Sequence, residues 1–477
     1  MIPLSVWVIV SIQVVLGLLD VVVHHELVAR LPWRAGAGPE LRLHGIRNLA
    51  YAAIFLVLAW VVPLGWAALA LVGFLAIEIV ITFTDWFVED ATRRLPSTER
   101  ALHGLLAINF GALLAFLAPV VWQWLQAPTS IQFADRGVWS WLASMASAGL
   151  LVMAVRDFAA ARRTRQLQDR PLDPELVDRR RWLVTGATGF IGQRLTEALA
   201  RGGQEVTVLT REVSKAGVLK PPFRVVTNLD QIGAGERFDV IVHLAGEPVA
   251  VGLWNESRRG RIMNSRPELA RRLIDLVDRL DVKPRVWIGA SAVGWYGDCG
   301  ETTLDERAVA RDGFTHRSCE AAETASMLAE RRGMRVVMLR IGLVLGREGG
   351  LLAQLLAPFD LGLGGRLGSG RQWMSWIERD DLVRLIVHVV ANESIRGPLN
   401  AVAPHPVTNR EFTKALARTI RRPALLAIPQ FVLLAAMGDM ARELVLASQR
   451  VVPAKALEHG FEFRWPKIDA ALARSLS

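Results

Sequence analysis

Glycines at positions 186, 189 and 192 have the spacing of a phosphate-binding turn. They follow a short apolar segment at 181–185 and open a helical segment that runs through residue 200. The glycines permit a tight turn and a close approach of the backbone to a pyrophosphate, and the helix start offers free N–H groups. The sequence therefore predicts a dinucleotide site whose cofactor contacts are Gly186, Thr188, Gly189, Phe190, Ile191 and Gly192.

The second expected strand, 205–210, ends in Thr210 and is followed by Arg211. NAD-preferring sites of this type often carry an acidic residue here for the ribose hydroxyls, whereas a guanidinium attracts a 2′-phosphate. We therefore expect both residues to contact the cofactor and the cofactor to be NADP. The alternative is that Arg211 is a solvated surface arginine.

Further apolar segments at 238–244, 285–289 and 334–339 alternate with helical segments such as 268–280. This alternation predicts a Rossmann-like, doubly wound parallel sheet, whose ligands bind at the carboxyl ends of the strands. The residues expected there as further cofactor contacts are Leu244, Ala245, Gly246 and Arg340, and Ser291 and Tyr296 are expected there as catalytic candidates.

Residues 181–477 resemble the atypical extended short-chain dehydrogenases of the nucleoside-diphosphate-sugar epimerase-like type. The segments that carry the resemblance are VTGATGFIG at 184–192, HLAGEP at 243–248, SAVGWYG at 291–297, LRIGLVLG at 339–346 and GGRLGSGRQWMSWIERDDL at 364–382. The resemblance implies an NADP-binding domain at 181–400 and a small family-specific substrate lobe at 401–477. It also implies that Gln372, Trp376 and Asp380 border the substrate cleft.

The chain departs from the proton-transfer pair that short-chain dehydrogenases usually carry, a tyrosine followed four residues later by lysine. Of its two tyrosines, Tyr51 lies in an apolar run and Tyr296 is followed by Gly300. The resemblance places Cys319 and Glu323 at the two positions, on a helix expected at 314–325. Cys319 is then a catalytic candidate if its thiolate is stabilised, or a small buried thiol if it is not.

Three functions stay open. The first is an NADP-dependent oxidoreductase or epimerase-like enzyme acting on a small-molecule substrate. The second is a non-catalytic NADP sensor that regulates the N-terminal part, and the third is a membrane domain that handles metal ions or protons. The sequence identifies neither the substrate nor the oligomeric state.

The first third of the chain is unusually apolar, and the mean hydropathy of the whole chain is +0.28. Segments at 2–23, 48–63, 66–84, 104–124 and 138–155 predict an all-α transmembrane bundle over residues 1–155, followed by a basic linker at 156–180. Arginines concentrate after the first, third and fifth segments, so the positive-inside rule predicts an inner-membrane protein with its N-terminus outside and its nucleotide-binding domain in the cytoplasm. The net charge of +10 is then explained by contact with anionic lipid rather than nucleic acid.

Polar residues in the apolar third form a repeat. Asp20 is followed by Glu40 and His44, and Asp85 is followed by Glu99 and His103. Each Glu-x3-His pair shares one helix face, and Glu78 lies inside an apolar run, where an ionisable group suggests function. One interpretation is a metal or proton site formed by His44, His103, Glu40, Glu99 and Glu78, with His24, His25, Glu26, Asp20 and Asp85 nearby. The other is a set of hydrated helix-end charges that balance arginines.

Overall fold

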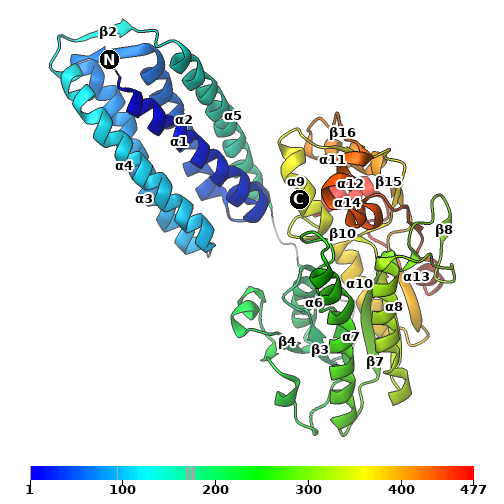
Figure 1. Cartoon of the computed structure of the whole chain (residues 1–477). Coiled ribbons are helices and arrows are strands. Elements are labelled where there is room, and N and C mark those ends of the chain that lie inside the picture. Colours follow the sequence, from blue (N-terminus) through cyan, green and yellow to red (C-terminus); the bar gives the residue numbers. More distant parts are fainter. Residues whose placement is uncertain (1, 94, 168–170, 173–177) are drawn as a thin grey trace. The chain divides into compact units, whose positions relative to one another are not determined.

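The computed structural model describes residues 2–93, 95–167, 171–172 and 178–477 (Figure 1). The chain divides into two compact units, Met1–Asp169 and Arg170–Leu476. The second unit contains both the predicted nucleotide lobe and the predicted substrate lobe.

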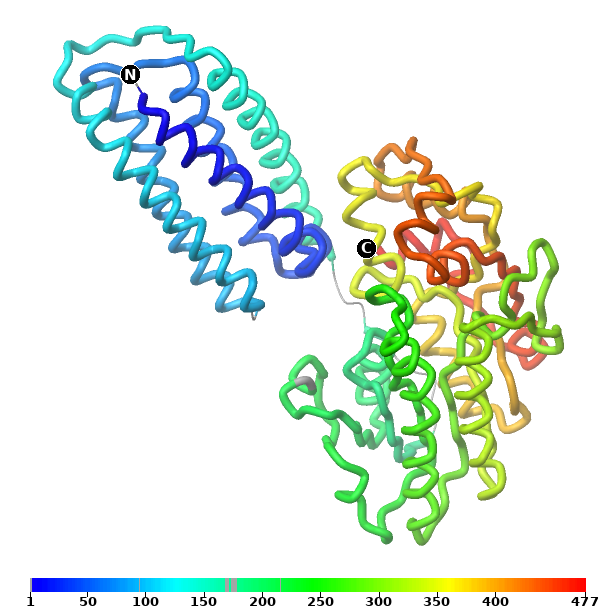
Figure 2. The backbone as a smooth tube through the Cα atoms, viewed as in Figure 1, coloured from blue at the N-terminus to red at the C-terminus, as the bar shows by residue number. Residues whose placement is uncertain are grey.

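The N-terminal unit is a bundle of five long helices that run alongside one another (Figure 2). The first helix continues into a π-helix, η1, and a short antiparallel pair of strands joins two of the connections at one end of the bundle. Each of the five helical segments is long and apolar enough to cross a membrane. The elements are α1 Leu4–Leu19, η1 Asp20–Val28, η2 Leu31–Trp33, α2 Gly38–Trp60, β1 Val61–Leu64, α3 Ala68–Thr92, α4 Ser97–Leu125, β2 Ser130–Phe133 and α5 Val138–Gln166.

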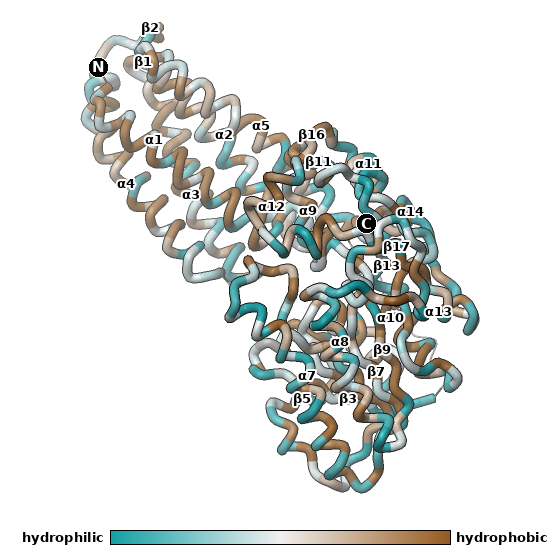
Figure 3. The backbone as a smooth tube through the Cα atoms, turned by 45° about the vertical axis from the view of Figure 1, so that its right-hand side comes forward, coloured by the Kyte–Doolittle hydropathy of each residue, from teal (hydrophilic) through white to brown (hydrophobic). Residues whose placement is uncertain are grey.

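Apolar residues are spread along the bundle helices (Figure 3), and they include both buried and exposed side chains. Ile54 and Leu113 are fully buried between helices, whereas Phe87, Ile108 and Met145 each expose more than two thirds of their surface. A helix that is apolar all round belongs in a large protein core or in lipid. The outward apolar side chains are therefore suited to a lipid environment.

Two boundaries predicted from the sequence are wrong. Helix α2 begins at Gly38 rather than near residue 48, and α5 continues to Gln166, so residues 156–166 are helix rather than linker. Charged side chains interrupt the apolar pattern at these ends, but the folded bundle pairs them. Arg156 on α5, for example, donates to both carboxylate oxygens of Glu26 at 2.5 and 2.7 Å.

The C-terminal unit is built on a seven-stranded parallel sheet with the order β14-β9-β7-β6-β3-β4-β5. The chain moves outward from β3 in one direction through β4 and β5, and then in the other direction from β6. This reversal beside the first strand is the switch point at which doubly wound sheets bind ligands. The strands are β3 Arg181–Thr185, β4 Glu205–Leu209, β5 Arg224–Val226, β6 Val240–His243, β7 Val286–Ala292, β9 Arg335–Ile341 and β14 Gly397–Ala401.

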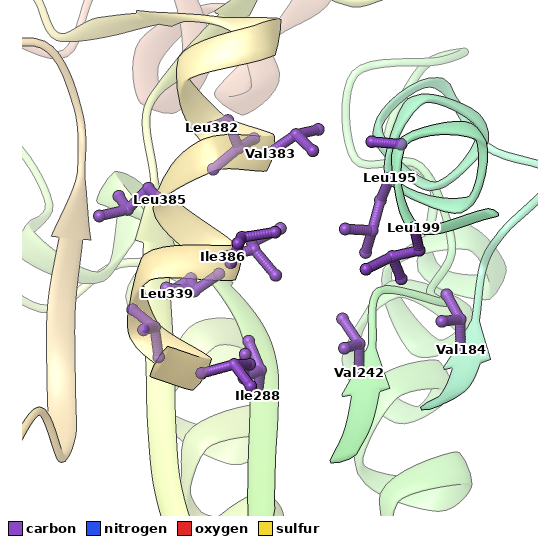
Figure 4. Close-up of a cluster of buried hydrophobic side chains, with 14 of the residues drawn as sticks. Val184, Leu195, Leu199, Val242, Ile288, Leu339, Leu382, Val383, Leu385 and Ile386 are labelled. Carbon is purple, nitrogen blue, oxygen red and sulfur yellow. The ribbon is translucent and has the colours of Figure 1, made fainter. Parts of the chain in front are cut away.

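Helices cover both faces of this sheet. Helices α6 (Phe190–Arg201) and α10 (Arg379–Ala391) pack on one face, where Leu195 of α6 and Ile386 of α10 join a core with Val184 of β3 (Figure 4). Helices α7 (Glu256–Arg279) and α8 (Phe314–Met327) pack on the opposite face, to which the adjacent strand residue Leu183 points. The alternation of Leu183 and Val184 therefore buries both faces of the strand.

The rest of the unit forms a small lobe of short strand pairs and helices. Its strands pair as β10 with β13, β11 with β16, β12 with β15 and β8 with β17. Asp380, at the start of α10, binds both Arg194 of α6 and Arg474 of α14 (Ile468–Ser475), and so ties the lobe to the helix that follows the glycine turn. The elements are β8 Thr303–Leu304, β10 Leu343–Leu345, α9 Gly350–Asp360, β11 Gly365–Leu367, β12 Trp373–Met374, β13 Trp376–Glu378, β15 Val407–Thr408, α11 Asn409–Ile420, β16 Leu426–Ile428, α12 Gln430–Met437, β17 Arg450–Val451, α13 Ala454–Glu458 and α14 Ile468–Ser475.

Candidate functional site

The glycine turn between β3 and α6 leaves no room for a side chain at positions 186 and 192. Gly186 has a φ of +71°, and a Cβ on it would lie 2.7 Å from the backbone nitrogen of Ala245. A Cβ on Gly192 would lie 2.1 Å from the carbonyl oxygen of Gly186. Helix α6 starts after Gly189 without a side-chain cap, so N–H groups of its first turn stay free for an anion. The turn has the form that a dinucleotide diphosphate requires.

Two side chains next to the turn, those of Phe190 and Ile191, pack against other parts of the C-terminal unit. Phe190 turns its ring against Gly346 and Gly349 of the small lobe, where any Cβ would lie 2.5 Å from the ring. Ile191 packs against the sheet core, and the carbonyl of Thr188 accepts a 2.7 Å hydrogen bond from Gln193. The backbone of these residues is therefore the part best placed for a phosphate.

Thr210 and Arg211 follow β4, at the same edge of the sheet. Thr210 is buried, and its hydroxyl donates to the carbonyl of Glu212 at 3.3 Å. Arg211 is exposed, and among the described residues it has no hydrogen bond or ion pair. Its guanidinium is therefore available to a ligand.

The loop after β6 brings a guanidinium that the sequence analysis did not single out. Leu244 and Ala245 are partly buried and Gly246 is exposed. A Cβ on Gly246 would lie 2.6 Å from Cζ of Arg266, so only glycine fits beside this arginine. Burial lowers the pKa of Arg266, and its Nη1 donates to the carbonyl of Glu247 at 3.3 Å. The sequence signal that could have identified Arg266 is an arginine on α7, the helix that follows the glycine-containing loop after β6.

Ser291, Glu323 and Arg340 form one connected group at the ends of β7 and β9 and on α8. The hydroxyl of Ser291 donates to Oε1 of Glu323 at 2.6 Å. Arg340 binds the same carboxylate with two hydrogen bonds, at 3.0 and 3.1 Å. Arg340 is a residue of β9 itself, 3% exposed, so its guanidinium is occupied by Glu323 instead of being open to the cofactor. The expected cofactor contact of Arg340 stays a prediction.

Tyr296 contacts Arg340 of this group and is fully buried. Its hydroxyl is 2.7 Å from Oδ1 of Asn400 and 2.9 Å from the carbonyl of Asp305, and it accepts a hydrogen bond from Arg340 at 3.2 Å. Burial raises the pKa of Tyr296 to about 12, although Arg340 opposes this. The contacts favour a structural role for Tyr296 over its expected catalytic one.

Cys319 is partly buried on α8, with Sγ 3.8 Å from the carbonyl of Ala292. Burial raises the pKa of its thiol, so a stabilised thiolate is not favoured. Cys299 is also a free thiol, so the two are not bridged. These contacts favour a neutral Cys319 beside Ser291.

The three residues expected to border the cleft hold the small lobe together. Gln372 donates to the carbonyls of Leu367 and Val445, at 3.0 and 3.1 Å. Trp376 is fully buried and donates to the carbonyl of His405 at 3.1 Å.

Asp380, the third of them, is 2% exposed and accepts hydrogen bonds from Arg194 and Arg474. These two arginines keep its pKa below the ordinary value although burial opposes ionisation. The nearby Glu378 lies beside a negative charge instead, and burial together with the charge of Asp380 raises its pKa to about 8.

The polar residues of the N-terminal bundle gather at one end, and the two halves of the repeat exchange partners. Nε2 of His103 lies 3.2 Å from Oδ2 of Asp20, and Nε2 of His44 lies 3.1 Å from Oδ2 of Asp85. His103, from the second half of the repeat, thus contacts Asp20 from the first half. His44, from the first half, contacts Asp85 from the second half.

Only some of the metal candidates expected from the sequence come together. Glu99 and His103 join one group of potential ligands and His44 joins a second. Glu40 and Glu78 belong to neither group: Glu40 pairs with Arg93 at 2.8 Å, and Glu78 accepts a 3.1 Å hydrogen bond from Thr82. Glu89, which the sequence analysis did not consider, belongs to the second group, and Asp20 and His25 belong to the first.

A parallel sheet with a switch point at β3, a glycine turn and a serine at the end of β7 define a nucleotide-binding protein of the extended short-chain dehydrogenase class. The chain belongs to the NAD-dependent epimerase/dehydratase family, whose model matches residues 182–401, and a domain of unknown function, DUF1731, matches residues 428–475. The expected fold and the expected family are thereby confirmed, and with them a nicotinamide dinucleotide as the cofactor.

Relatives of known sequence cover the C-terminal unit. The chain is 36% identical over 296 residues to the chloroplastic epimerase family protein SDR39U1 homolog of Arabidopsis thaliana, covering 61% of this chain and 84% of that protein. It is 36% identical over 299 residues to the epimerase family protein YfhF of Bacillus subtilis, covering 62% and 97%. Among solved structures, human epimerase family protein SDR39U1 with NADPH has a TM-score of 0.56 and 31% identity, covering 62% of this chain and 99% of that one.

Proposed function

We propose that this chain is a membrane-anchored, NADPH-dependent oxidoreductase of the epimerase family that acts on a small molecule. The observation that carries the proposal is the glycine turn at 186–192, where an uncapped helix start follows a turn with no room for a side chain at Gly186 or Gly192. The loop after β6 borders this turn, and Ser291 lies near the end of neighbouring β7. A cofactor on the turn thus has a polar group suited to a substrate oxygen along the same sheet edge.

NADPH is favoured over NADH by Arg211. This side chain is exposed directly after β4, and a planar guanidinium is well suited to a phosphate group. The human relative SDR39U1, which is 31% identical, was solved with NADPH. Both observations support a 2′-phosphate contact at this position.

The proposed chemistry uses the connected group of Ser291, Glu323 and Arg340. NADP bound at the turn would accept or supply a hydride. During oxidation, a substrate hydroxyl would pass its proton to Oγ of Ser291 while Ser291 passes its own proton to Glu323, which already accepts that hydrogen bond at 2.6 Å. Reduction of a carbonyl would run the same transfers in reverse. Arg340 holds the carboxylate in position.

The enzymatic proposal is tested by NADPH oxidation with a panel of carbonyl and sugar-nucleotide substrates, using the full-length chain in detergent. Ser291→Ala should lower kcat at least about a hundredfold, the usual size of a positioned proton transfer. Ser257→Ala, an exposed serine on α7, is the matched control and should leave turnover unchanged. Equal turnover in Ser291→Ala and the wild type would exclude the proton path.

A non-catalytic NADPH-binding module is the second candidate function. It is favoured by the burial of Tyr296 and by the raised pKa of Cys319, because neither group is poised to replace the tyrosine of the usual pair. Pre-steady-state measurement of hydride transfer separates the two candidates. Tight NADPH binding without any hydride transfer to the substrate panel would support the module and contradict the enzyme.

We further propose that the N-terminal bundle anchors the protein in the inner membrane, with its N-terminus outside and the nucleotide-binding unit in the cytoplasm. Five apolar helices and their outward apolar side chains support the anchor. Arginines gather at the end of the bundle where α5 finishes, which supports the orientation. Resistance to alkaline extraction, with an N-terminal tag accessible only from outside, is expected; release by alkali would contradict the anchor.

A further inference from the structure

We propose that Asp20, His25, Glu99 and His103 bind one divalent transition-metal ion inside the N-terminal bundle. Each of the four offers one nitrogen or oxygen atom, and these atoms all lie within 4.8 Å of one another. Three of the residues are buried, and the side chain of His103 is 12% exposed.

The spacing of the four groups is that of a coordination shell. Zinc bonds to imidazole nitrogen and carboxylate oxygen at about 2.0–2.1 Å, so neighbouring ligand atoms of a tetrahedral ion lie roughly 3.3 Å apart. Nε2 of His25 lies 3.3 Å from Oδ2 of Asp20 and 3.8 Å from Oε1 of Glu99. Nε2 of His103 lies 3.2 Å from the same oxygen of Asp20. Small shifts of these side chains would place all four around one ion.

The backbone explains how two helical segments present four ligands. In the π-helix η1, Asp20 and His25 are five residues apart, the spacing at which a π-helical turn closes. In α4, Glu99 and His103 are four residues apart and share a face of an α-helix. The wide turn of η1 is therefore suited to bringing its two ligands onto the face that meets α4.

Hydrogen bonding alone does not satisfy this cluster. Nε2 of His25 is buried and, among the described residues, has no hydrogen-bond partner, although it lies within 4 Å of two carboxylates. The His25 ring also stacks on the ring of His44, with centroids 4.5 Å apart and an interplanar angle of 5°. Two imidazoles stacked in this way repel each other if both are charged. A metal ion on Nε2 would satisfy the nitrogen without adding a proton.

The other nitrogen of His103 has the partner that metal-bound histidines commonly have. Its Nδ1 lies 3.4 Å from Oε2 of Glu89, while Nε2 faces Asp20. A carboxylate on the far nitrogen fixes the tautomer and makes the ligating nitrogen more basic. Oδ1 of Asp20 is held in turn by His24 at 2.9 Å, which leaves Oδ2 directed at the proposed ion.

Charge balance also favours a cation. Eight carboxylates of this unit are buried, and the ion pairs among the described residues bring three arginines and four histidines to the group. The carboxylates are those of Asp20, Glu26, Glu40, Glu78, Asp85, Glu89, Glu99 and Asp157, the arginines are Arg47, Arg93 and Arg156, and the histidines, which are charged only when protonated, are His24, His25, His44 and His103. Buried charges are costly unless paired. One arginine, Arg93, binds both oxygens of Glu99, but each oxygen has a second lone pair with which to coordinate an ion.

The donor set identifies the class of metal. Two imidazole nitrogens and two carboxylate oxygens, without sulfur, suit Zn²⁺, Fe²⁺ or Mn²⁺ rather than Cu⁺. The second group of potential ligands, His25, His44 and Glu89, shares His25 with the first. One ion in the first group is therefore the simplest occupancy.

The test is the metal content of the full-length protein in detergent, measured by inductively coupled plasma mass spectrometry after incubation with Zn²⁺, Mn²⁺ or Fe²⁺ and removal of free ion. The wild type should retain about one ion per chain. The double variant His25→Gln, His103→Gln should lose at least tenfold in affinity. The matched control is His405→Gln, since His405 is an exposed histidine of the C-terminal unit; it should retain the ion.

X-ray absorption of the metal-loaded wild type provides a measurement that does not depend on how the variants fold. It should show only nitrogen and oxygen neighbours, at about 2.0–2.2 Å for zinc. A wild-type chain that retains none of the three ions would overturn the proposal. So would a double variant that binds metal as well as the wild type.

Discussion

The ion pair between Glu323 and Arg340 should contribute measurably to the free energy of unfolding of the C-terminal unit. Arg340 is 3% exposed, and its guanidinium makes two hydrogen bonds to the Glu323 carboxylate. Removing one partner of a buried ion pair typically costs about 3–5 kcal/mol, because the other charge is left uncompensated. Glu323→Gln should therefore lower the free energy of unfolding of the C-terminal unit by about 3 kcal/mol or more. Glutamine can still accept the hydrogen bond from Ser291, so the loss reports mainly on the charge.

A double-mutant cycle isolates this interaction. Arg340→Met should cost a similar amount alone, and the double variant should cost at least about 2 kcal/mol less than the sum of the two single variants, because neither charge is then left unpaired. The assay is denaturant unfolding of the full-length protein in detergent, followed by a spectroscopic signal of the C-terminal unit. Additive costs, or a cost of Glu323→Gln below about 1 kcal/mol, would refute the assignment of this pair as the support of Ser291.

Three further predictions concern the cofactor, pH and the lobe. Arg211→Ala should weaken NADPH binding at least about tenfold and leave NADH binding unchanged, whereas exposed Arg201→Ala should change neither; an unaltered preference would count against the 2′-phosphate contact. Burial lowers the pKa of His243 to about 4 from its usual 6.5. The neutral His243 therefore contributes fully to stability above about pH 6.5. As the pH falls toward about 4, the free energy of unfolding should drop by up to about 3 kcal/mol. A His243→Asn variant whose free energy of unfolding depends on pH in the same way as that of the wild type would contradict this. Arg194→Met should destabilise the C-terminal unit by about 3 kcal/mol, since Asp380 is buried; a melting temperature equal to that of the wild type would show that Arg474 suffices.

The sequence was most informative where local chemistry determines local structure. Strand β3 has the predicted bounds, and α6 starts within the predicted glycine turn. Glycine spacing and apolar runs report directly on turns and buried strands, so these elements could be predicted without knowledge of distant contacts.

Long-range pairing is what the sequence could not supply. Arg340 was expected at a strand end facing the cofactor, but Glu323, 17 residues earlier on α8, binds its guanidinium inside the unit. Likewise, the apolar segment of α2 was predicted to begin near residue 48, after the charged start of the helix. The structure pairs His44 there with Asp85 from a different helix, and only the folded bundle makes that pairing visible.

The central claim is that the turn at 186–192 binds a nicotinamide dinucleotide through its backbone. Isothermal titration of the full-length protein with NADPH tests it most directly, comparing the wild type with Gly192→Ala and with Gly260→Ala, whose added Cβ meets no atom within 4 Å. The wild type and Gly260→Ala should bind one NADPH per chain, and Gly192→Ala should bind at least about a hundredfold more weakly, because its Cβ would displace the turn. A folded wild-type protein that binds neither NADPH nor NADH, or a Gly192→Ala variant with full affinity, would contradict the account.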